Sequence, residues 1–134
     1  MMSTKKVEVM IDDERFVFEL FVEQAPKICG MILDNLPVEG TVQHAKLNGQ
    51  LIFATLPFSC EFENKCRGGD LKTYDVAYYN PRNQLCILYG VGTDEPLPIS
   101  HIGRIVEGMD RIELVGMRNW MTQGSRLKIT KIVE

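Results

Sequence analysis

The stretch that decides the fold lies in the C-terminal third, where residues 103–110 read Gly-Arg-Ile-Val-Glu-Gly-Met-Asp. Residues 102–106 are short and apolar, which is typical of a buried strand. Several positions after this strand have helical spacing and predict a short helix that Gly116 closes. A further apolar-rich strand is expected over residues 127–133. The residues at helical spacing are Met109, Ile112, Glu113 and Val115.

Nearer the N-terminus, apolar residues alternate along residues 7–11 and again along residues 16–20, which predicts two strands. Asp12-Asp13-Glu14 between them is typical of a tight turn, so the two strands should form a hairpin. Pro26 follows, and its fixed φ and missing N–H suit a first helical turn. The apolar stripe after Pro26 predicts a helix that ends before Pro37. This stripe consists of Ile28, Met31, Ile32 and Leu36.

The middle of the chain contains four further predicted strands. The turn Leu47-Asn48-Gly49 contains Asn-Gly, a strong hairpin signal, and residues 80–83 form another turn. Residues 56–71 and 90–98 are expected to be irregular connections with several Gly and Pro residues. Short strands, two helices and no β-α-β alternation predict a mostly β, antiparallel barrel or sandwich with helices at its ends. The four strands are expected at residues 41–46, 50–55, 75–79 and 84–89.

The composition is that of a globular protein. Of the 134 residues, 45% are hydrophobic and 25% are charged, which excludes a disordered chain. The 15 Lys and Arg residues against 18 Asp and Glu leave a net charge of −3, which argues against a nucleic-acid partner. The apolar runs are too short to span a membrane, and no apolar segment of a secretory signal follows Lys5 and Lys6. We therefore expect a cytoplasmic protein with a single domain over residues 1–134.

The cysteine pattern does not indicate a zinc site, because no C-x2-C pair is present and the two histidines are far from a zinc-finger pattern. Without a secretory signal a reducing compartment is expected, so free thiols are the favoured interpretation. Cys60 and Cys66 are the only pair close enough in sequence to form a disulfide or share a metal ion. Neither a metal nor a cofactor is predicted. The four cysteines are Cys29, Cys60, Cys66 and Cys86.

Four segments carry a family resemblance. Residues 18–29 contain an acidic residue, Ala-Pro and Lys-Ile-Cys at the entry to the first helix, and residues 40–44 read Gly-Thr-Val-Gln-His. Residues 83–87 read Asn-Gln-Leu-Cys-Ile, and residues 103–110 contain Gly-x-Ile-x-x-Gly-Met-Asp. In this order the segments resemble the cyclophilin family of peptidyl-prolyl isomerases, over about two-thirds of the chain. The resemblance implies a closed eight-stranded antiparallel barrel with two capping α-helices. Gly69-Asp70-Leu71 and the run over residues 78–83 look like those of short bacterial and archaeal cyclophilin-like proteins of unassigned activity.

The residues that the resemblance assigns to catalysis differ in this chain. In cyclophilins an arginine directly after the active-site His donates toward the twisted peptide bond, and an aromatic pocket holds the substrate proline. Here Ala45 follows His44. Lys46 comes next, but neighbouring strand residues point to opposite faces, so it replaces the arginine poorly unless a bulge re-aims it. Cys86 corresponds to the pocket phenylalanine, and Trp120 lies after the Gly-x-Ile element rather than before it as in the family.

Candidate ligand-binding residues are polar or cavity-facing residues of the predicted strands. The two histidines among them could equally be structural residues with satisfied hydrogen bonds. Tyr78 and Tyr79 point to opposite faces of one strand, so only one of them lines a given cavity. Arg67 and Arg82 lie in connections and could hold an anionic ligand. The candidates are Gln43, His44, Lys46, Tyr79, Gln84, Cys86 and His101.

Three functional hypotheses follow. The leading one is a cyclophilin-like barrel that binds a small molecule or a short peptide, with weak or no isomerase activity. The second is an active peptidyl-prolyl isomerase with an altered site, in which Lys46 or another base supplies the donor. The third is a non-catalytic interaction module that uses the barrel edge. The oligomeric state is left open.

Overall fold

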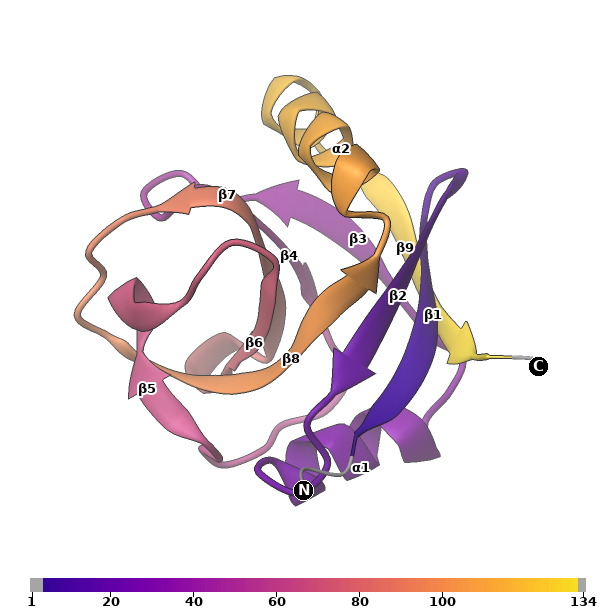
Figure 1. The fold of residues 1–134 in the computed structure, drawn as a ribbon, viewed down its shortest axis with the longest axis vertical. Helices are drawn as coiled ribbons and strands as arrows, with labels where there is room; N and C mark the ends of the chain where they lie inside the picture. Colours follow the sequence, from indigo (N-terminus) through magenta and orange to yellow (C-terminus); the bar gives the residue numbers. More distant parts are fainter. Residues whose placement is uncertain (1–3, 133–134) are drawn as a thin grey trace.

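The computed structural model describes residues 4–132, and these form a closed barrel with a helix at each end (Figure 1). The strands pair antiparallel in the order β2-β1-β9-β3-β4-β7-β6-β8, and β2 pairs with β8 to close the ring. A ninth strand, β5, pairs with β8 outside this ring. The strands are β1 (Lys5–Ile11), β2 (Glu14–Leu20), β3 (Val38–His44), β4 (Gly49–Thr55), β5 (Lys65–Arg67), β6 (Asp75–Tyr79), β7 (Gln84–Gly92), β8 (Pro98–Glu107) and β9 (Ser125–Lys131). The helices are α1 (Pro26–Asp34) and α2 (Met109–Met121), with the short 3-10 helices η1 (Gly68–Asp70) and η2 (Asn80–Arg82).

This architecture confirms the mostly β, eight-stranded antiparallel barrel with two helices. The predicted β1–β2 hairpin forms, but Glu14, which was expected in the turn, is the first residue of β2 and pairs with Ile11. The β3–β4 hairpin also forms around residues 45–48. The closing strand β9 lies where residues 127–133 predict one, although Val133 falls outside the described residues. Neither helix of the described chain is long and apolar enough to cross a membrane.

Strand β8 starts earlier than its apolar pattern predicts, at Pro98 rather than residue 102. Its first residues pair with β5 and β6, and its last residues pair with β2. Ser100 lies in this first part and is fully buried, because its hydroxyl accepts a hydrogen bond from the Glu63 N–H at 3.0 Å and donates one to Asn80 at 2.8 Å. A polar residue satisfied in this way interrupts the apolar pattern, which explains why the early strand and its partner β5 are missed.

The expected end of the second helix at Gly116 is wrong. Helix α2 continues to Met121, and Gly116 is a buried residue in its interior. A Cβ atom at Gly116 would collide with the ring of Tyr89 on β7. Gly116 therefore allows α2 to pack closely against the barrel, and the chain leaves the helix at Thr122, which has extended backbone.

The irregular segment between β4 and β5 is held to both the barrel and α1. The carboxylate of Glu63 accepts hydrogen bonds from the backbone N–H groups of Lys27 (3.1 Å) and Ile28 (2.7 Å) in the first turn of α1. These donors have no partner within the helix, and a negative charge at a helix N-terminus is favourable. The Tyr78 hydroxyl adds a hydrogen bond to the Phe58 carbonyl at 2.9 Å. The segment is thus fixed in place without regular secondary structure.

Strand β7 is buried on both of its faces. Leu85, Ile87 and Tyr89 point into the barrel and belong to the main core. Cys86 and Leu88 point outward, and they belong to a second apolar cluster, here called the outer cluster. Because successive strand residues face opposite sides, one continuous apolar run supplies both clusters. The buried members of the outer cluster are Ala45, Leu51, Ala77, Cys86, Leu88 and Ile99.

We predict opposite effects for the same substitution in the two helices. Gly116→Ala should lower the free energy of unfolding by about 1–3 kcal/mol, because the new methyl group overpacks the contact with Tyr89. Gly30→Ala in α1 should raise it by about 0.5–1 kcal/mol, because a Cβ there meets no atom within 4 Å and alanine favours the helix. Urea denaturation of both variants measures the difference. Equal effects would contradict the packing role of Gly116.

Candidate functional site

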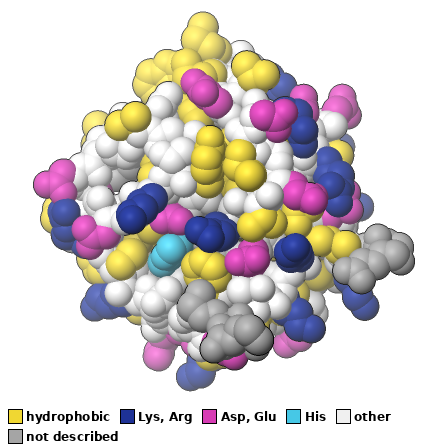
Figure 2. Space-filling model, in the orientation of Figure 1, with side chains coloured by type: hydrophobic (Ala, Val, Ile, Leu, Met, Phe, Trp, Pro, Cys, Tyr) yellow, Lys and Arg dark blue, Asp and Glu magenta, His cyan; other side chains and the backbone are white. Residues whose placement is uncertain are grey.

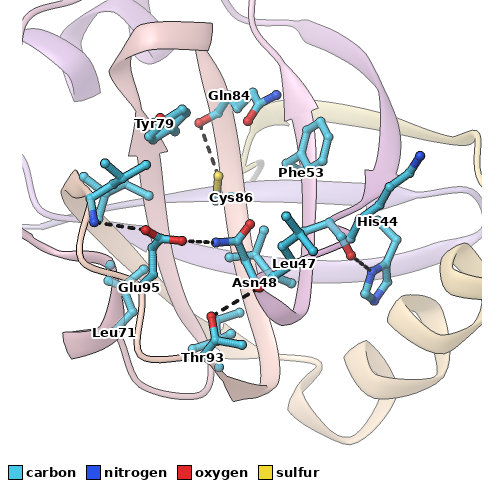
Figure 3. Close-up of a pocket in the computed structure, with 18 of the residues that line it drawn as sticks. His44, Leu47, Asn48, Phe53, Leu71, Tyr79, Gln84, Cys86, Thr93 and Glu95 are labelled. Atoms are coloured by element: carbon cyan, nitrogen blue, oxygen red, sulfur yellow. Dashed lines mark hydrogen bonds between the residues drawn. The ribbon is translucent and has the colours of Figure 1, made fainter.

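A cavity of about 770 Å³ lies on the outside of the barrel wall, above the outer cluster (Figure 3). We call it the outer cavity. Its size is in the range of small-molecule sites. Its floor is apolar, with Cys86 and Leu88 from β7, Leu51 and Phe53 from β4, and Ile99 from β8. The polar and charged lining residues are Gln43, His44, Lys46, Asn48, Tyr79, Arg82, Gln84, Thr93, Glu95 and Gln123.

Strand register brings the polar candidates onto one wall. Tyr79 of β6 lies opposite Gln84 of β7, so the two side chains stand next to each other on the outer face. Cys86 follows two residues after Gln84 and faces the same side, opposite Phe53 of β4. Of the seven candidate residues, six line the outer cavity, and His101 does not.

The imidazole of His44 is buried and both of its nitrogens have partners. Nδ1 lies 2.7 Å from the carbonyl oxygen of Ala45, and Nε2 lies 2.6 Å from the hydroxyl of Tyr89. A carbonyl oxygen only accepts, so Nδ1 carries the proton and Nε2 of the neutral ring accepts from Tyr89. The ring also makes an edge contact with Trp120 at 4.9 Å between centroids. These contacts hold the end of β3 in place and leave His44 without a free nitrogen for a ligand. Figure 3 shows the first of them, the contact of Nδ1.

Lys46 lies on the cavity side, contrary to the alternation expected from a continuous strand. Strand β3 ends at His44, so the chain has already begun its turn at Lys46, and both Ala45 and Lys46 line the outer cavity. Ala45 is 7% exposed and donates its N–H to the Leu51 carbonyl at 2.9 Å. An alanine thus occupies the position that the cyclophilin resemblance assigns to arginine, with an exposed lysine beside it.

Glu95 fastens the loop over residues 93–97 to the β3–β4 turn. One carboxylate oxygen accepts from Asn48 Nδ2 at 2.9 Å, and the other accepts from the Leu97 N–H at 3.0 Å (Figure 3). Gly68 and Gly69 allow the loop to approach η1, since a Cβ at either glycine would press against Glu95 or Asp94. This loop therefore forms one side of the outer cavity, and both carboxylate oxygens of Glu95 are already hydrogen-bonded within the protein.

The two arginines considered as anion-binding residues differ in their surroundings. Arg67 forms ion pairs with Asp94 at 2.5 Å and Asp70 at 3.6 Å, and the hydrogen bond with Asp94 raises the pKa of Arg67. Arg82 lines the outer cavity, as does Lys46, and neither forms an ion pair with any residue of 4–132. The charged groups that line the outer cavity are thus two cations without an ion-pair partner in the described part of the chain, Lys46 and Arg82, and one carboxylate, Glu95.

Cys86 forms part of the apolar floor of the outer cavity, and its thiol is not a nucleophile. Its complete burial raises the pKa of Cys86 to about 12, so the thiolate is scarce at neutral pH. Cys86 is one of four free cysteines. Cys60 packs against the main core and Cys66 against the outer cluster. Within the described part of the chain, no group of three or more His, Cys, Asp or Glu side chains is arranged to hold a metal ion.

His101 takes part in a separate interaction on β8. Its Nε2 lies 3.2 Å from a carboxylate oxygen of Asp75, and its ring contacts Phe21 edge-on. Burial on its own would raise the pKa of Asp75. The hydrogen bonds from His101 and from the Lys72 N–H outweigh this effect, so the pKa of Asp75 lies below its ordinary value of 3.8. His101 thereby stabilises the barrel away from the outer cavity.

Several lining residues were not recognised as candidates from the sequence. Asn48, Thr93, Glu95 and Gln123 come from turns and connections, where polar residues are common and carry no periodic signal. Asn48 is the asparagine of the Asn-Gly turn signal, so the turn explained its presence without a functional role. They line the cavity because connections that are distant in the sequence meet in space, as the β3–β4 turn and the loop over residues 93–97 do.

Comparisons with known proteins agree with the barrel fold. The family model described as Cyclophilin-like matches residues 5–121. The solved structure of McbB in complex with tryptophan superimposes with a TM-score of 0.83 at 18% identity, over 96% of this chain and 45% of McbB. The chain thus spans less than half the length of McbB. The solution structure of hypothetical protein AF2241 from Archaeoglobus fulgidus matches with a TM-score of 0.69 at 21% identity, over 98% of each chain. No curated protein matches the sequence.

We predict that Asp75→Asn destabilises the protein in a pH-dependent way. Because the folded pKa of Asp75 is depressed, its contribution to stability is present above the unfolded value near 3.8 and is lost as the pH falls through the lower folded value. At pH 7 the variant should lose about 1 kcal/mol of unfolding free energy, and the loss should shrink below the unfolded value. Urea denaturation at neutral and acidic pH measures this. A loss of the same size at both would contradict the interpretation.

Proposed function

Because the chain belongs to the cyclophilin-like family, we propose that it binds a small molecule or a short peptide in the outer cavity, with weak or no prolyl isomerase activity. The observation that carries this proposal is the outer cavity itself, which combines an apolar floor with two cations that have no ion-pair partner among the described residues. A concave apolar site with a few polar groups is the usual form of a ligand site.

The lining favours a ligand with an apolar body and a carboxylate group. Phe53, Leu88 and Ile99 offer an apolar surface for the body. Lys46 and Arg82 supply positive charge, and an Arg guanidinium binds a carboxylate with two parallel hydrogen bonds. Glu95 also lines the cavity, but its single negative charge is outnumbered by the two cations, and both of its oxygens already accept hydrogen bonds within the protein. The side-chain amides of Gln43, Gln84 and Gln123 add donors and acceptors around the opening.

The structural neighbours support binding of a small molecule in general terms. McbB, which has the same fold over 45% of its length, is found in complex with tryptophan, a molecule with an aromatic body and a carboxylate. At 18% identity this similarity concerns the fold, so tryptophan serves here as a probe of ligand class.

Three differences argue against efficient isomerase activity. Rotation about a peptide bond has a barrier of about 18–20 kcal/mol, which cyclophilins lower by donating a hydrogen bond toward the twisted amide. Ala45 has no donor at that position. Cys86 provides no aromatic surface for a substrate proline, and Trp120 contacts His44 on the other side of the strand end. Lys46 lacks the planar fork of arginine.

We predict that tryptophan binds more tightly than tryptamine, which lacks the carboxylate. Lys46→Gln and Arg82→Gln should each weaken tryptophan binding about threefold, in line with exposed charge pairs, and should not weaken the binding of tryptamine, whose only charge is an ammonium group. Isothermal titration calorimetry measures these affinities. The control is Arg104→Gln, an exposed arginine on β8 outside the cavity lining. Failure of tryptophan, related aromatic acids and short peptides to bind would overturn the proposal and favour the interaction module.

We also predict that a protease-coupled assay on an Ala-Pro peptide shows an isomerisation rate close to the uncatalysed rate. Ala45→Arg restores the side chain that the family carries and should raise the rate above that of the natural chain. A natural kcat/KM near the level of catalytic cyclophilins would contradict the prediction. In that event, loss of activity in Lys46→Ala would identify Lys46 as the donor.

A further inference from the structure

Helix α2 is apolar on two opposite faces. Its inner face packs on the barrel through Ile112, Val115, Gly116 and Asn119, all buried. Its outer face nevertheless exposes large hydrophobic side chains, and Figure 2 shows hydrophobic side chains gathered at the top of the molecule, where α2 lies in Figure 1. A surface helix normally carries polar residues on its outer face. The exposed fractions are 70% for Leu114, 43% for Met117, 53% for Trp120 and 79% for Met121.

The exposed residues have the spacing of a helix–helix seam. Leu114, Met117 and Met121 follow one another at intervals of three and four residues, as a, d and a positions of a heptad do. Glu113 lies at the g position on one side of this seam, and Arg118 lies at the e position on the other side. The seam begins after Asp110, because two copies of that carboxylate would repel each other in the preceding d position.

We propose that α2 is the interface of a homodimer, in which the helices of two copies pack in parallel around a twofold axis. The charges select this arrangement. In a parallel pair a g residue meets the e residue five positions later on the partner, so Glu113 faces Arg118 of the partner subunit. In an antiparallel pair that sets Leu114 beside Met121 of the partner subunit, Arg118 would face a second arginine, and Glu113 would lie too far along the helix to meet Arg118 of the partner subunit. The helix is thus complementary to itself in the parallel orientation.

The contacts within one subunit allow this pairing. Arg118 lies 3.4 Å from Asp12, but both side chains are more than two-fifths exposed, and such a pair contributes little to stability. Glu113 has no ion pair with any residue of 4–132. The dimer needs no change in the inner face of α2, which stays packed on the barrel. It is also independent of ligand binding in the outer cavity.

Sedimentation velocity of the full chain from micromolar to millimolar concentration tests the dimer. The natural chain should pass from monomer to dimer over this range, and Leu114→Lys should remain monomeric throughout. Val91→Lys serves as the control, because Val91 is 75% exposed but lies on β7, away from the outer face of α2. A natural chain that stays monomeric, or a dimer unaffected by Leu114→Lys, would overturn the proposal.

A charge exchange tests the orientation. Glu113→Arg should weaken the dimer about tenfold, because it replaces two attractive pairs per dimer by two repulsive ones. Arg118→Glu should weaken it to a similar extent, and the double variant should restore affinity to within about threefold of the natural chain. Thermal unfolding of each variant shows that the barrel is intact. A double variant no tighter than either single variant would rule out the parallel pair.

Disulfide cross-linking gives an independent measure of orientation. In the parallel dimer residue 114 lies beside its own copy, so Leu114→Cys should form a disulfide-linked dimer on mild oxidation. The natural chain, which keeps its four free cysteines, is the control. If Leu114→Cys links only to a Met121→Cys variant, the helices are antiparallel and the proposal is wrong.

Discussion

The barrel wall around β7 has to be buried on both sides, and much of the rest of the molecule follows from this constraint. Leu85, Ile87 and Tyr89 fill the barrel, whereas Cys86 and Leu88 face outward and are just as apolar. Exposing that second face to water would be unfavourable. The connections around β4, β5 and β7 therefore fold back over it, and they cover it incompletely. The space that remains is the outer cavity, whose apolar floor is the outer face of the wall.

A small number of polar contacts hold the connections that cover the outer cluster and the end of the barrel next to α2. Glu95 joins the loop over residues 93–97 to Asn48, and Arg67 holds the same loop through Asp94. At the end of β3, the Tyr89 hydroxyl meets His44, and the Tyr89 ring packs against Gly116 of α2. Tyr89 thus links the barrel core, the end of β3 that directly precedes Ala45 and Lys46, and the helix whose outer face is apolar. The cavity and α2 share this support, although the functions proposed for them are separate.

Local patterns in the sequence predicted those elements whose neighbours along the chain decide their structure. Two hairpins were predicted correctly from local patterns. One follows from the alternation along residues 7–11 and 16–20, and the other from the Asn-Gly turn after β3. The prediction failed where the structure of an element depends on a contact with a distant part of the chain. Ser100 is buried because Glu63 and Asn80 satisfy its hydroxyl, so β8 begins earlier than its apolar pattern suggests. Gly116 resembled a helix end, but it lies inside α2. A glycine is needed there because the ring of Tyr89 leaves no room for a side chain.

For the candidate site, the family resemblance nominated Gln43, Lys46, Gln84 and Cys86, and strand alternation placed Gln84 and Cys86 on one face, because residues two apart on a strand share a face. The sequence by itself also determined that no arginine follows His44. Only the tertiary structure decided that the strand ends at His44, so that Lys46 joins Ala45 at the outer cavity. It alone also brought Glu95 to Asn48, 47 residues away. A periodic pattern reports on the faces of one element, whereas a cavity depends on which distant connections meet above it.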